Sequence, residues 1–541
     1  MMQNVNFISQ ASIVVGCCLT FLTSNLHAKL PGRDGESPIP VIDVHTHIFN
    51  ANDLPLEGLL GALGVPDSIA HSLAIVLNAW TPVDDLDAPL PPRSVYTTSA
   101  MSMRNKLGPG KLLRSVLTPK QRQELAKYAG VPEKSAIQSV SVSQQAGSDA
   151  EIVARALQKA DFPPGEQRTE KQSVKMQSVE IQTAGFKGYL DFVDIMTNGN
   201  LRIAQRLHAD EYPKVDLFVH HMMDMEKPYA DEPRVSFDKQ ITRMAKLDRR
   251  FDGRFMHFVA FDPFRRDNSL ASVIRGIDAG AAGVKFYPPS GYRATDNAIP
   301  SKPCIFHPSA RKRWNSRYSH LTGVELDAIN EKLFLYCEKH DIPIFTHCTP
   351  GGFEAEKGYG QMADPVYWEK VLIKHPSLRL CLAHSGGEDY WFSSSNNKGQ
   401  TFGENVVKLC LKYPNVYCEV GYMEKILDPA LAGLLDTRLR SVINRRSTDG
   451  AWAFGEKIMY GTDWHMIHKE QHHRDYLCKF HTLFAEPGLK NWQRPFFSGN
   501  AVRFLKLPKL AKDERFTVAQ RDYWQSLVTR SQANSKPRHF E

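Results

Sequence analysis

The feature that most constrains the fold is a series of eight short apolar runs, separated by stretches with helical periodicity. Most of these runs are continuously apolar, which is typical of parallel strands that are covered on both faces. Eight strands alternating with helices predict an α/β fold, a (β/α)8 TIM barrel whose active site lies at the carboxyl ends of the strands. The runs are residues 41–49, 215–223, 254–263, 281–289, 342–348, 378–385, 416–422 and 457–463.

Four of the runs carry metal-capable side chains near their C-terminal ends. His45 and His47 close the first run, and His347, His384 and Asp463 close the fifth, sixth and eighth. Because successive side chains of a strand point to opposite faces, His45 and His47 point to the same side and can chelate one cation. Histidines from two later strands and a carboxylate from a third complete a nitrogen and oxygen site suited to zinc.

The composition is that of a globular protein and does not indicate a nucleic-acid partner. The chain has 541 residues, enough for two or three average domains or for one large barrel with insertions. Its formal charge of +8 arises from 67 basic and 59 acidic residues, without a long block of Lys and Arg. Such a balance argues against nucleic-acid binding. A homo-oligomer stays open.

Residues 1–28 have features of an export signal. They contain no charged residue, residues 11–22 form an apolar core, and Ala28 ends a tolerable cleavage site. The four residues ending at Cys17 also fit a lipoprotein signal, in which Cys17 becomes the lipidated first residue. We therefore expect a periplasmic or lipid-anchored protein with no transmembrane helix in the mature chain. The alternative is a mis-assigned start upstream of a cytosolic enzyme.

A long segment, residues 50–209, separates the first run from the second. It is mainly helical, with helices expected to start at Thr118 and at Ser148, where the Ser-x-x-Glu pattern ending at Glu151 fits a capping box. Because this insertion leaves the predicted mouth of the barrel, a lid is one hypothesis for it. The barrel itself is then built from residues 41–49 and 210–506.

A second insertion, residues 291–323, is strongly basic. Its six Lys and Arg residues against one Asp indicate either a solvated loop or a positive rim that steers an acidic substrate. Residues 507–541 form a C-terminal extension that is polar until a short helix.

Several motifs together resemble one family. D-V-H-T-H at 43–47, G-V-K-F-Y-P-P at 283–289, A-H-S-G-G at 383–387, Y-G-T-D-W at 460–464 and S-G-N-A-V-R-F-L at 498–505, with the strand-end His347, resemble the amidohydrolase superfamily. The most similar branch is that of amidohydrolase-related proteins, which includes metal-dependent hydrolases and some decarboxylases. The resemblance covers residues 41–49 and about 210–506.

The resemblance implies roles for the strand-end residues. His45, His47 and His347 would be metal ligands, and Asp463 would bind the metal or the water that it activates. His384 would be either a ligand of a second metal or an acid/base beside a single one.

Lys285, in the fourth run, has two readings. A lysine in an apolar strand is expensive to bury unless charged partners or a modification compensate. The resemblance implies either a carboxylated lysine that bridges two metals, or a lysine that binds substrate or pairs with a carboxylate.

These groups predict hydrolysis with one or two divalent metal ions, zinc or manganese. A divalent cation lowers the pKa of bound water from about 15.7 towards about 7. Asp463 can accept the water proton and pass it to the leaving group, while the metal or protonated His384 polarises the carbonyl. Arg293 and Tyr287 are expected to hold a substrate carboxylate. We therefore expect a metal-dependent hydrolase of an amide, lactone or ester bond in a small, carboxylate-bearing substrate.

Two other functions stay open. The first is a metal-dependent decarboxylase on the same site, which needs no attacking water. The second is an exported binding protein without catalysis, although a degenerate barrel should have lost ligands that this chain retains.

The remaining histidines and two acidic residues have weaker signals. The histidines in or beside the second and third runs are explained by ring packing or by hydrogen bonds behind the ligands. The histidines after the eighth run indicate a surface loop or a fortuitous metal binder. Glu388 and Glu419 receive no role from the sequence. The histidines are His220, His221 and His257, and then His465, His468, His472 and His473.

Overall fold

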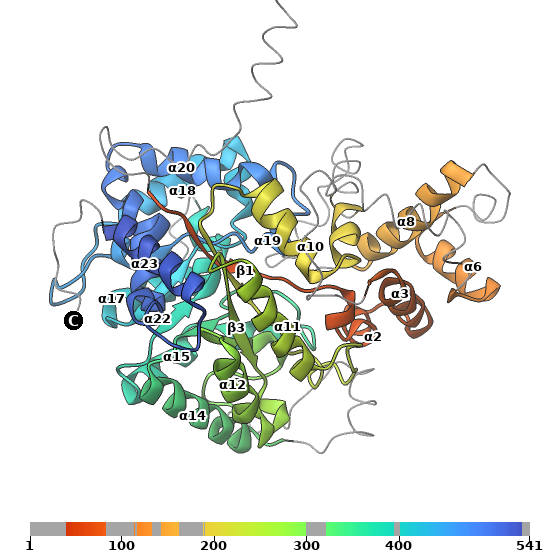
Figure 1. Cartoon of the computed structure of the whole chain (residues 1–541), viewed down its shortest axis with the longest axis horizontal. Helices are drawn as coiled ribbons and strands as arrows, with labels where there is room; N and C mark the ends of the chain where they lie inside the picture. The colour runs from red at the N-terminus through yellow and green to blue at the C-terminus, as the bar shows by residue number, and fades with distance from the viewer. Residues whose placement is uncertain are drawn as a thin grey trace, which may run out of the picture.

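The computed structural model describes residues 39–82, 113, 116–131, 142–161, 188, 190–298, 321–393 and 401–532 (Figure 1). Eight parallel strands pair in the order of the sequence. The predicted TIM barrel is therefore confirmed. The strands are β1 (Ile42–Thr46), β2 (Leu217–His221), β3 (Phe255–Phe261), β4 (Gly283–Phe286), β5 (Ile344–Thr346), β6 (Leu380–Leu382), β7 (Val416–Glu419) and β8 (Ile458–Met459).

The first strand and the segment after the last one meet, which brings the two edges of the sheet together. Val44 N in β1 donates to Tyr460 O at 3.1 Å, and Asp463 N donates to His45 O at 2.6 Å. Every strand residue is buried, in agreement with the continuously apolar runs. The strands are shorter than the runs because the last residues of each run leave the ladder and form the mouth of the barrel.

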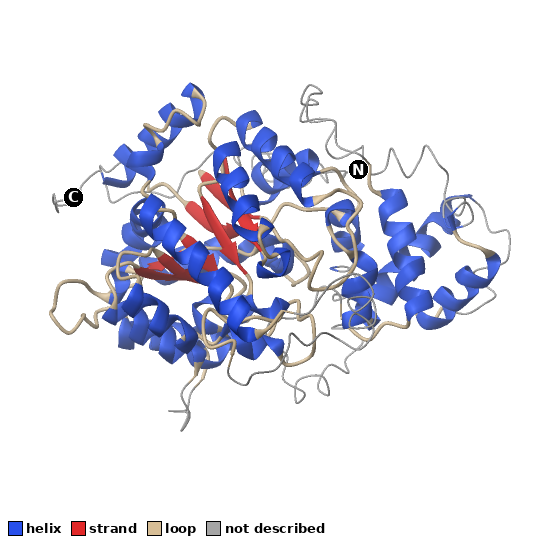
Figure 2. Cartoon of the chain, turned by 90° about the horizontal axis from the view of Figure 1, so that it is seen from below, coloured by secondary structure: helices blue, strands red, loops and turns tan. Residues whose placement is uncertain are grey.

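Helices between the strands cover the outside of the barrel (Figure 2). In α14, Thr322 and Glu325 form a capping box at the N-terminus, and the helix turns Leu326, Leu333 and Cys337 inward at helical spacing. The main outer helices are α11 (Phe237–Arg250), α12 (Asn268–Ala279), α14 (Gly323–His340), α15 (Val366–Lys374), α17 (Phe402–Lys412), α18 (Pro429–Val442) and α20 (Tyr476–Ala485).

The segment between β1 and β2 contains further helices. In Figure 1, α6 and α8 lie beyond α3, at the end of the molecule away from the strands. The predicted start at Thr118 is confirmed, since its side chain caps α6 in a capping box with Gln121. The predicted start at Ser148 is wrong, because the helical backbone of α8 already begins six residues earlier, at Val142. The helices are α2 (Leu56–Ala62), α3 (Asp67–Trp80), α6 (Pro119–Tyr128), α8 (Val142–Lys159), α10 (Asn200–Gln205) and the π-helix η3 (Arg206–Glu211).

The C-terminal extension packs against the barrel. Trp524 is fully buried in α23, and its indole N–H donates to Gly253 O at 2.7 Å. Leu507 and Trp524 belong to the same apolar cluster as strand residues such as Phe258 and Tyr417. The extension is therefore part of the core that the strands enclose. It contains α22 (Leu507–Leu510) and α23 (Val518–Gln532), which follow α21 (Asn500–Leu505) of the barrel.

Trp524→Phe is expected to lower the free energy of unfolding by about 1–3 kcal/mol, because it leaves the buried Gly253 carbonyl without its donor and a small void in the core. Urea denaturation measures the loss. Val518→Ala on the same helix, where Val518 is 62% exposed, is the control and should change stability by less than about 0.5 kcal/mol. Equal stability of the Trp524 variant and the wild type would show that α23 contributes little to the core.

Two predicted features lie outside the described residues. These are the export signal within residues 1–28 and most of the basic insertion, residues 299–320. Within the described ranges, no helix combines the length and apolar character needed to cross a membrane.

Candidate metal centre

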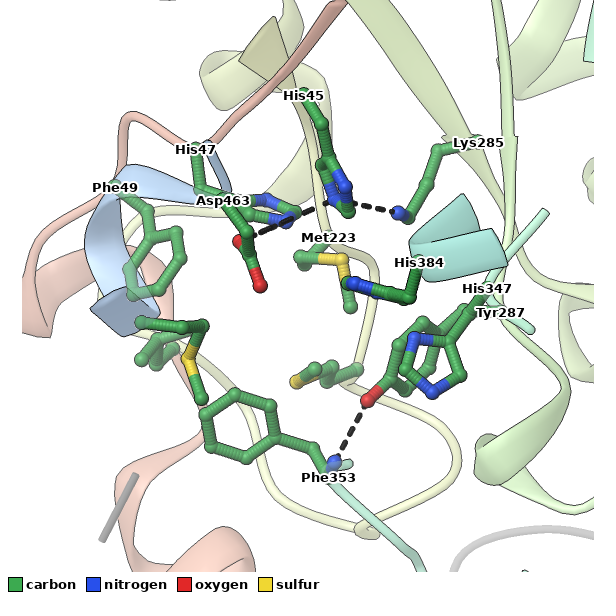
Figure 3. Close-up of a pocket in the computed structure, with 13 residues that line it drawn as sticks. His45, His47, Phe49, Met223, Lys285, Tyr287, His347, Phe353, His384 and Asp463 are labelled. Atoms are coloured by element: carbon green, nitrogen blue, oxygen red, sulfur yellow. Dashed lines mark hydrogen bonds and ion pairs between the residues drawn. The ribbon is translucent and has the colours of Figure 1, made fainter. Parts of the chain in front are cut away.

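The strand-end residues from β1 and β8 converge in a buried pocket at the mouth of the barrel (Figure 3). His47 Nε2 lies 3.5 Å from Asp463 Oδ1, and His45 Nε2 lies 3.9 Å from the same oxygen. One ligand atom of each residue lies within 4.8 Å of the other two. Two imidazole nitrogens and one carboxylate oxygen thus surround a single point, as the spacing of His45 and His47 predicted.

Hydrogen bonds behind the two histidines orient their rings. His47 Nδ1–H donates to His221 O at 2.8 Å, and His45 Nδ1 is hydrogen-bonded to Glu419 Oε1 at 3.0 Å. With Nδ1 occupied in both rings, both present Nε2 to Asp463. Such partners fix the tautomer of a ligating histidine and raise its basicity. The ring geometry therefore suits metal binding.

Asp463 combines a left-handed backbone with a buried carboxyl group, and both features are energetically unfavourable. Its backbone is left-handed, with φ 50° and ψ 50°, a region that L-residues adopt only when the surroundings enforce it. Burial raises the pKa of its carboxyl to about 7, although Lys285 and Lys469 oppose the rise. Its buried Oδ1 accepts no hydrogen bond from the described residues. A divalent cation between Oδ1 and the two imidazoles would compensate the burial, so the residues fit a metal ion.

Lys285 lies on the other side of His45. Its Nζ is 3.3 Å from His45 Nε2 and 4.7 Å from the centre of the Phe345 ring, and the side chain is almost completely buried. Burial and the charge of Lys285 together lower the pKa of His45 well below its usual value. Lys285 thus lines the same pocket as His45, His47 and Asp463.

His384 adjoins this group from β6. His384 and the following Ser385 have left-handed backbones, with φ 56° and 47°. Nδ1–H of His384 donates to Gly421 O at 2.9 Å, and the ring centre lies 4.8 Å from that of His45. Burial, helped by Lys285, lowers the pKa of His384 to about 3, so its imidazole is neutral at neutral pH in the metal-free protein. A neutral ring can bind a metal, whereas acting as an acid requires that a proton be supplied.

His347 lines the same pocket but lies outside the tight donor groups. Its Nε2–H donates to Gly351 O at 3.0 Å, and Thr349 Oγ1 lies 2.9 Å from the same nitrogen. The nitrogen through which His347 would bind an ion is therefore Nδ1. Its ring centre is 5.0 Å from that of His384 and 4.9 Å from that of Tyr287.

Glu419, to which the sequence assigned no role, connects two of the histidines. It accepts hydrogen bonds from His384 N at 2.6 Å and from Gly421 N, besides its bond to His45. Burial raises the pKa of Glu419 to about 8 against these bonds. The residue at 421 has to be small, since a Cβ there would lie 2.8 Å from both Glu419 Oε2 and His45 Nδ1. A glycine two residues after a strand-end carboxylate is the only local signal of this role.

The walls of the pocket are mostly apolar. Tyr287, one of the two predicted substrate-binding residues, is part of the wall, and its hydroxyl accepts a hydrogen bond from Phe353 N at 2.6 Å. Arg293 is not: its guanidinium stacks on Tyr367 at 4.9 Å and donates to Asp296 O at 3.2 Å. The apolar lining consists of Phe49, Leu54, Met223, Met225, Phe353 and Met466.

The remaining histidines differ in their surroundings. His221 is inside the barrel, with Nε2–H donating to Val44 O at 2.9 Å. His220 and His257 lie on either side of Asp248, at 2.7 and 2.6 Å, in a buried triad.

The predicted surface loop after β8 is wrong for two of its histidines. His465 and His468 are almost completely buried, and only His472 has a largely exposed side chain. Both buried rings are packed by segments distant in sequence, as His468 is hydrogen-bonded to Glu211 at 2.9 Å.

The chain combines a TIM barrel with a group of metal-capable side chains at the ends of its strands. The sequence model of the amidohydrolase family matches residues 196–507, more than half of the chain, and the chain belongs to this family. The match does not include His45 and His47, which reach the site through the pairing of β1 with β2. None of the curated proteins matches the chain.

Solved structures with a similar course of the chain share little sequence with it. An amidohydrolase from Burkholderia multivorans with bound zinc is 11% identical, over 58% of this chain and 91% of its own, with a TM-score of 0.34. A dihydroxybenzoic acid decarboxylase from Polaromonas sp. JS666, with bound manganese and 2-nitroresorcinol, is 14% identical over 61% and 93%, with a TM-score of 0.34. A TIM-barrel protein from Bordetella bronchiseptica is 14% identical over 62% and 85%, with a TM-score of 0.35.

Proposed function

We propose that this member of the amidohydrolase family is a metal-dependent hydrolase of an amide, lactone or ester bond. The observation that carries the proposal is the convergence of His45, His47 and Asp463 on one buried point at the barrel mouth. His384 and Lys285 adjoin this point, which leaves either one or two ions possible. Nitrogen and oxygen donors at this spacing favour zinc, with manganese as the second choice.

The residues of the site divide the chemistry between them. A bound divalent cation would supply Lewis acidity, which lowers the pKa of water and polarises the carbonyl under attack. Asp463 would accept the proton of the attacking water and return it to the leaving group, the role of a general base and then a general acid. His45 and His47 would hold the cation, and Lys285 and Tyr287, which line the same pocket, would bind a carboxylate of the substrate. The apolar walls take up the rest of a small molecule.

The apolar walls also support a second candidate, a decarboxylase. A carboxylate of the substrate that is bound beside Lys285 loses its hydration among Phe49, Met223 and Phe353, and desolvation favours the loss of carbon dioxide from an anion. In that reaction no attacking water is needed, and Asp463 would protonate the carbon that is left.

Metal analysis and product analysis test the proposal together. Protein purified without added metal or chelator is expected to contain one or two zinc or manganese ions per chain, and His47→Ala is expected to contain less. A panel of esters, lactones, amides and aromatic acids then separates hydrolysis from the release of carbon dioxide. Wild-type protein that binds no metal even after reconstitution would refute both candidates.

A further inference from the structure

A buried cluster that includes Glu211, Trp464 and His468 follows Asp463 and does not line the pocket. The short helix α19 (Trp464–Ile467) begins at the residue after Asp463, and Met466 N and Ile467 N donate to Asp463 O at 2.8 and 3.1 Å. Any movement of α19 therefore moves the backbone that carries the Asp463 carboxylate.

Glu211 holds both ends of α19. The indole N–H of Trp464 donates to Glu211 Oε2 at 2.6 Å, and Nε2–H of His468 donates to Oε1 at 2.9 Å. Trp464 and His468 are almost completely buried, and the side chain of Glu211 is fully buried. Tyr212, the next residue, donates its hydroxyl to His473 O at 2.5 Å. The residues at the end of the π-helix η3 are therefore hydrogen-bonded to the segment after Asp463 at three residues, Trp464, His468 and His473.

The inner side of α19 contacts the other metal-capable strand. His465 Nδ1–H donates to His47 O at 3.3 Å, and its ring packs on Phe49 with centres 4.1 Å apart. The helix is therefore fixed on one side by Glu211 and touches His47 on the other.

Glu211, His468 and His473 could also be read as a separate metal site, since their ligand atoms lie within 4.8 Å of one another. Arg206 contradicts that reading. Its Nε lies 2.7 Å from Glu211 Oε1, and its Nη2 lies 3.1 Å from His468 Nε2, so a positive charge already occupies the place that an ion would take. Arg474 adds a second cation 3.7 Å from Oε1.

The charge of Glu211 is stabilised at this place. Burial alone would raise the pKa of its carboxyl, but His468, His473 and Arg206 outweigh the burial and hold the pKa well below its usual value. A charged acceptor makes shorter and stronger hydrogen bonds than a neutral one, which suits an anchor for two buried N–H groups.

We propose that Glu211 is a positioning residue, which fixes α19 and thereby holds Asp463 in its left-handed conformation facing His45 and His47. The inference rests on the proposed metal-dependent function, because the placement of Asp463 matters only if it binds the ion or its water. A partner hydrogen-bonded directly to a metal ligand contributes about 10–100-fold to metal affinity, and we take the same range as the expected effect of Glu211, which acts through α19.

The test compares wild type with Glu211→Gln, which keeps the size and removes the charge. Metal-free proteins are titrated with Co²⁺, whose visible spectrum reports the ligand geometry, and hydrogen exchange of residues 462–470 is followed in the same proteins. We expect Glu211→Gln to bind Co²⁺ about 10–100-fold more weakly, with an altered spectrum and faster exchange in this segment. Trp464→Phe, which removes one of the two N–H donors, should give a smaller change.

Asp248→Asn is the matched control, since Asp248 is also a buried carboxylate between two histidines but lies away from the pocket. It should lower stability without changing Co²⁺ affinity or exchange in residues 462–470. Equal Co²⁺ affinity and spectrum for Glu211→Gln and wild type would overturn the proposal, as would an equal loss in Asp248→Asn.

Two further outcomes separate this inference from the proposed function. Wild type that does not bind Co²⁺ refutes the metal-dependent function. The hydrogen-exchange rates then test the positioning role of Glu211 separately. Unchanged rates in Glu211→Gln refute that role, and faster rates confined to residues 462–470 support it. Should Glu211→Gln fail to fold, Trp464→Phe is judged by the same two readouts, and no change in either overturns the proposal.

Discussion

Asp463→Asn is expected to lower kcat by about 10²–10⁴-fold at saturating metal, the range that a positioned general base contributes. Asparagine keeps the size of the side chain and one oxygen that can face the ion, but it cannot accept a proton from water. Turnover is measured on the best substrate of the ester, lactone and amide panel, with metal content measured in parallel. Turnover that persists in the metal-loaded variant would place the base elsewhere.

The same variant is expected to be at least as stable as the wild type when both are metal-free. Because burial raises the pKa of Asp463 from 3.8 to about 7, the folded chain binds this proton more tightly than the unfolded chain does. The stability that the protonated carboxyl contributes is thus fully present below about pH 4 and is lost as the pH rises through about 7. Asparagine does not titrate, so the variant should gain roughly 4 kcal/mol relative to wild type between about pH 4 and about pH 8. Urea denaturation at several pH values measures this gain, and a pH-independent difference would contradict it.

The sequence predicted those parts of the site that depend on local pattern. The apolar runs determine where the strands end, and the alternation of side chains along β1 places His45 and His47 on one side. Asp463 follows from the same rule at β8, because parallel strands of a barrel present their carboxyl ends at one mouth. The pocket brings these residues together with Lys285 and His384.

The parts that local pattern did not predict depend on contacts between distant segments. Glu419 is 374 residues away from His45, its partner, and Glu211 is 257 residues away from His468. The sequence therefore predicts a surface loop for the histidines after β8, although Glu211 packs against His468 and Phe49 packs against His465. Arg293 follows the fourth run, yet its guanidinium stacks on Tyr367 in α15 and is not part of the pocket wall. No spacing in the sequence specifies such pairs.

Glu419→Ala is expected to weaken zinc binding about 10–100-fold and to lower the free energy of unfolding by about 3–5 kcal/mol. The change removes the acceptor of three buried N–H groups at once, those of His45, His384 and Gly421. Buried donors without an acceptor cost about 1–3 kcal/mol each. The imidazole of His45 also loses the partner that fixes its tautomer, so its Nε2 no longer faces Asp463 in every molecule.

Zinc affinity is measured by competition with a chromophoric chelator, and stability by urea denaturation of the metal-free proteins. Glu419→Gln keeps one acceptor oxygen and should lose less zinc affinity and less stability than Glu419→Ala. Glu388→Ala serves as the control, because Glu388 is also a buried carboxylate but pairs with Lys425, at 2.9 Å, and belongs to none of the metal-capable groups among the described residues. That variant should lose stability and keep the zinc affinity of the wild type. A Glu419→Ala protein with wild-type zinc affinity would mean that the ring of His45 is oriented by its packing against Phe345 and His221 rather than by the carboxylate.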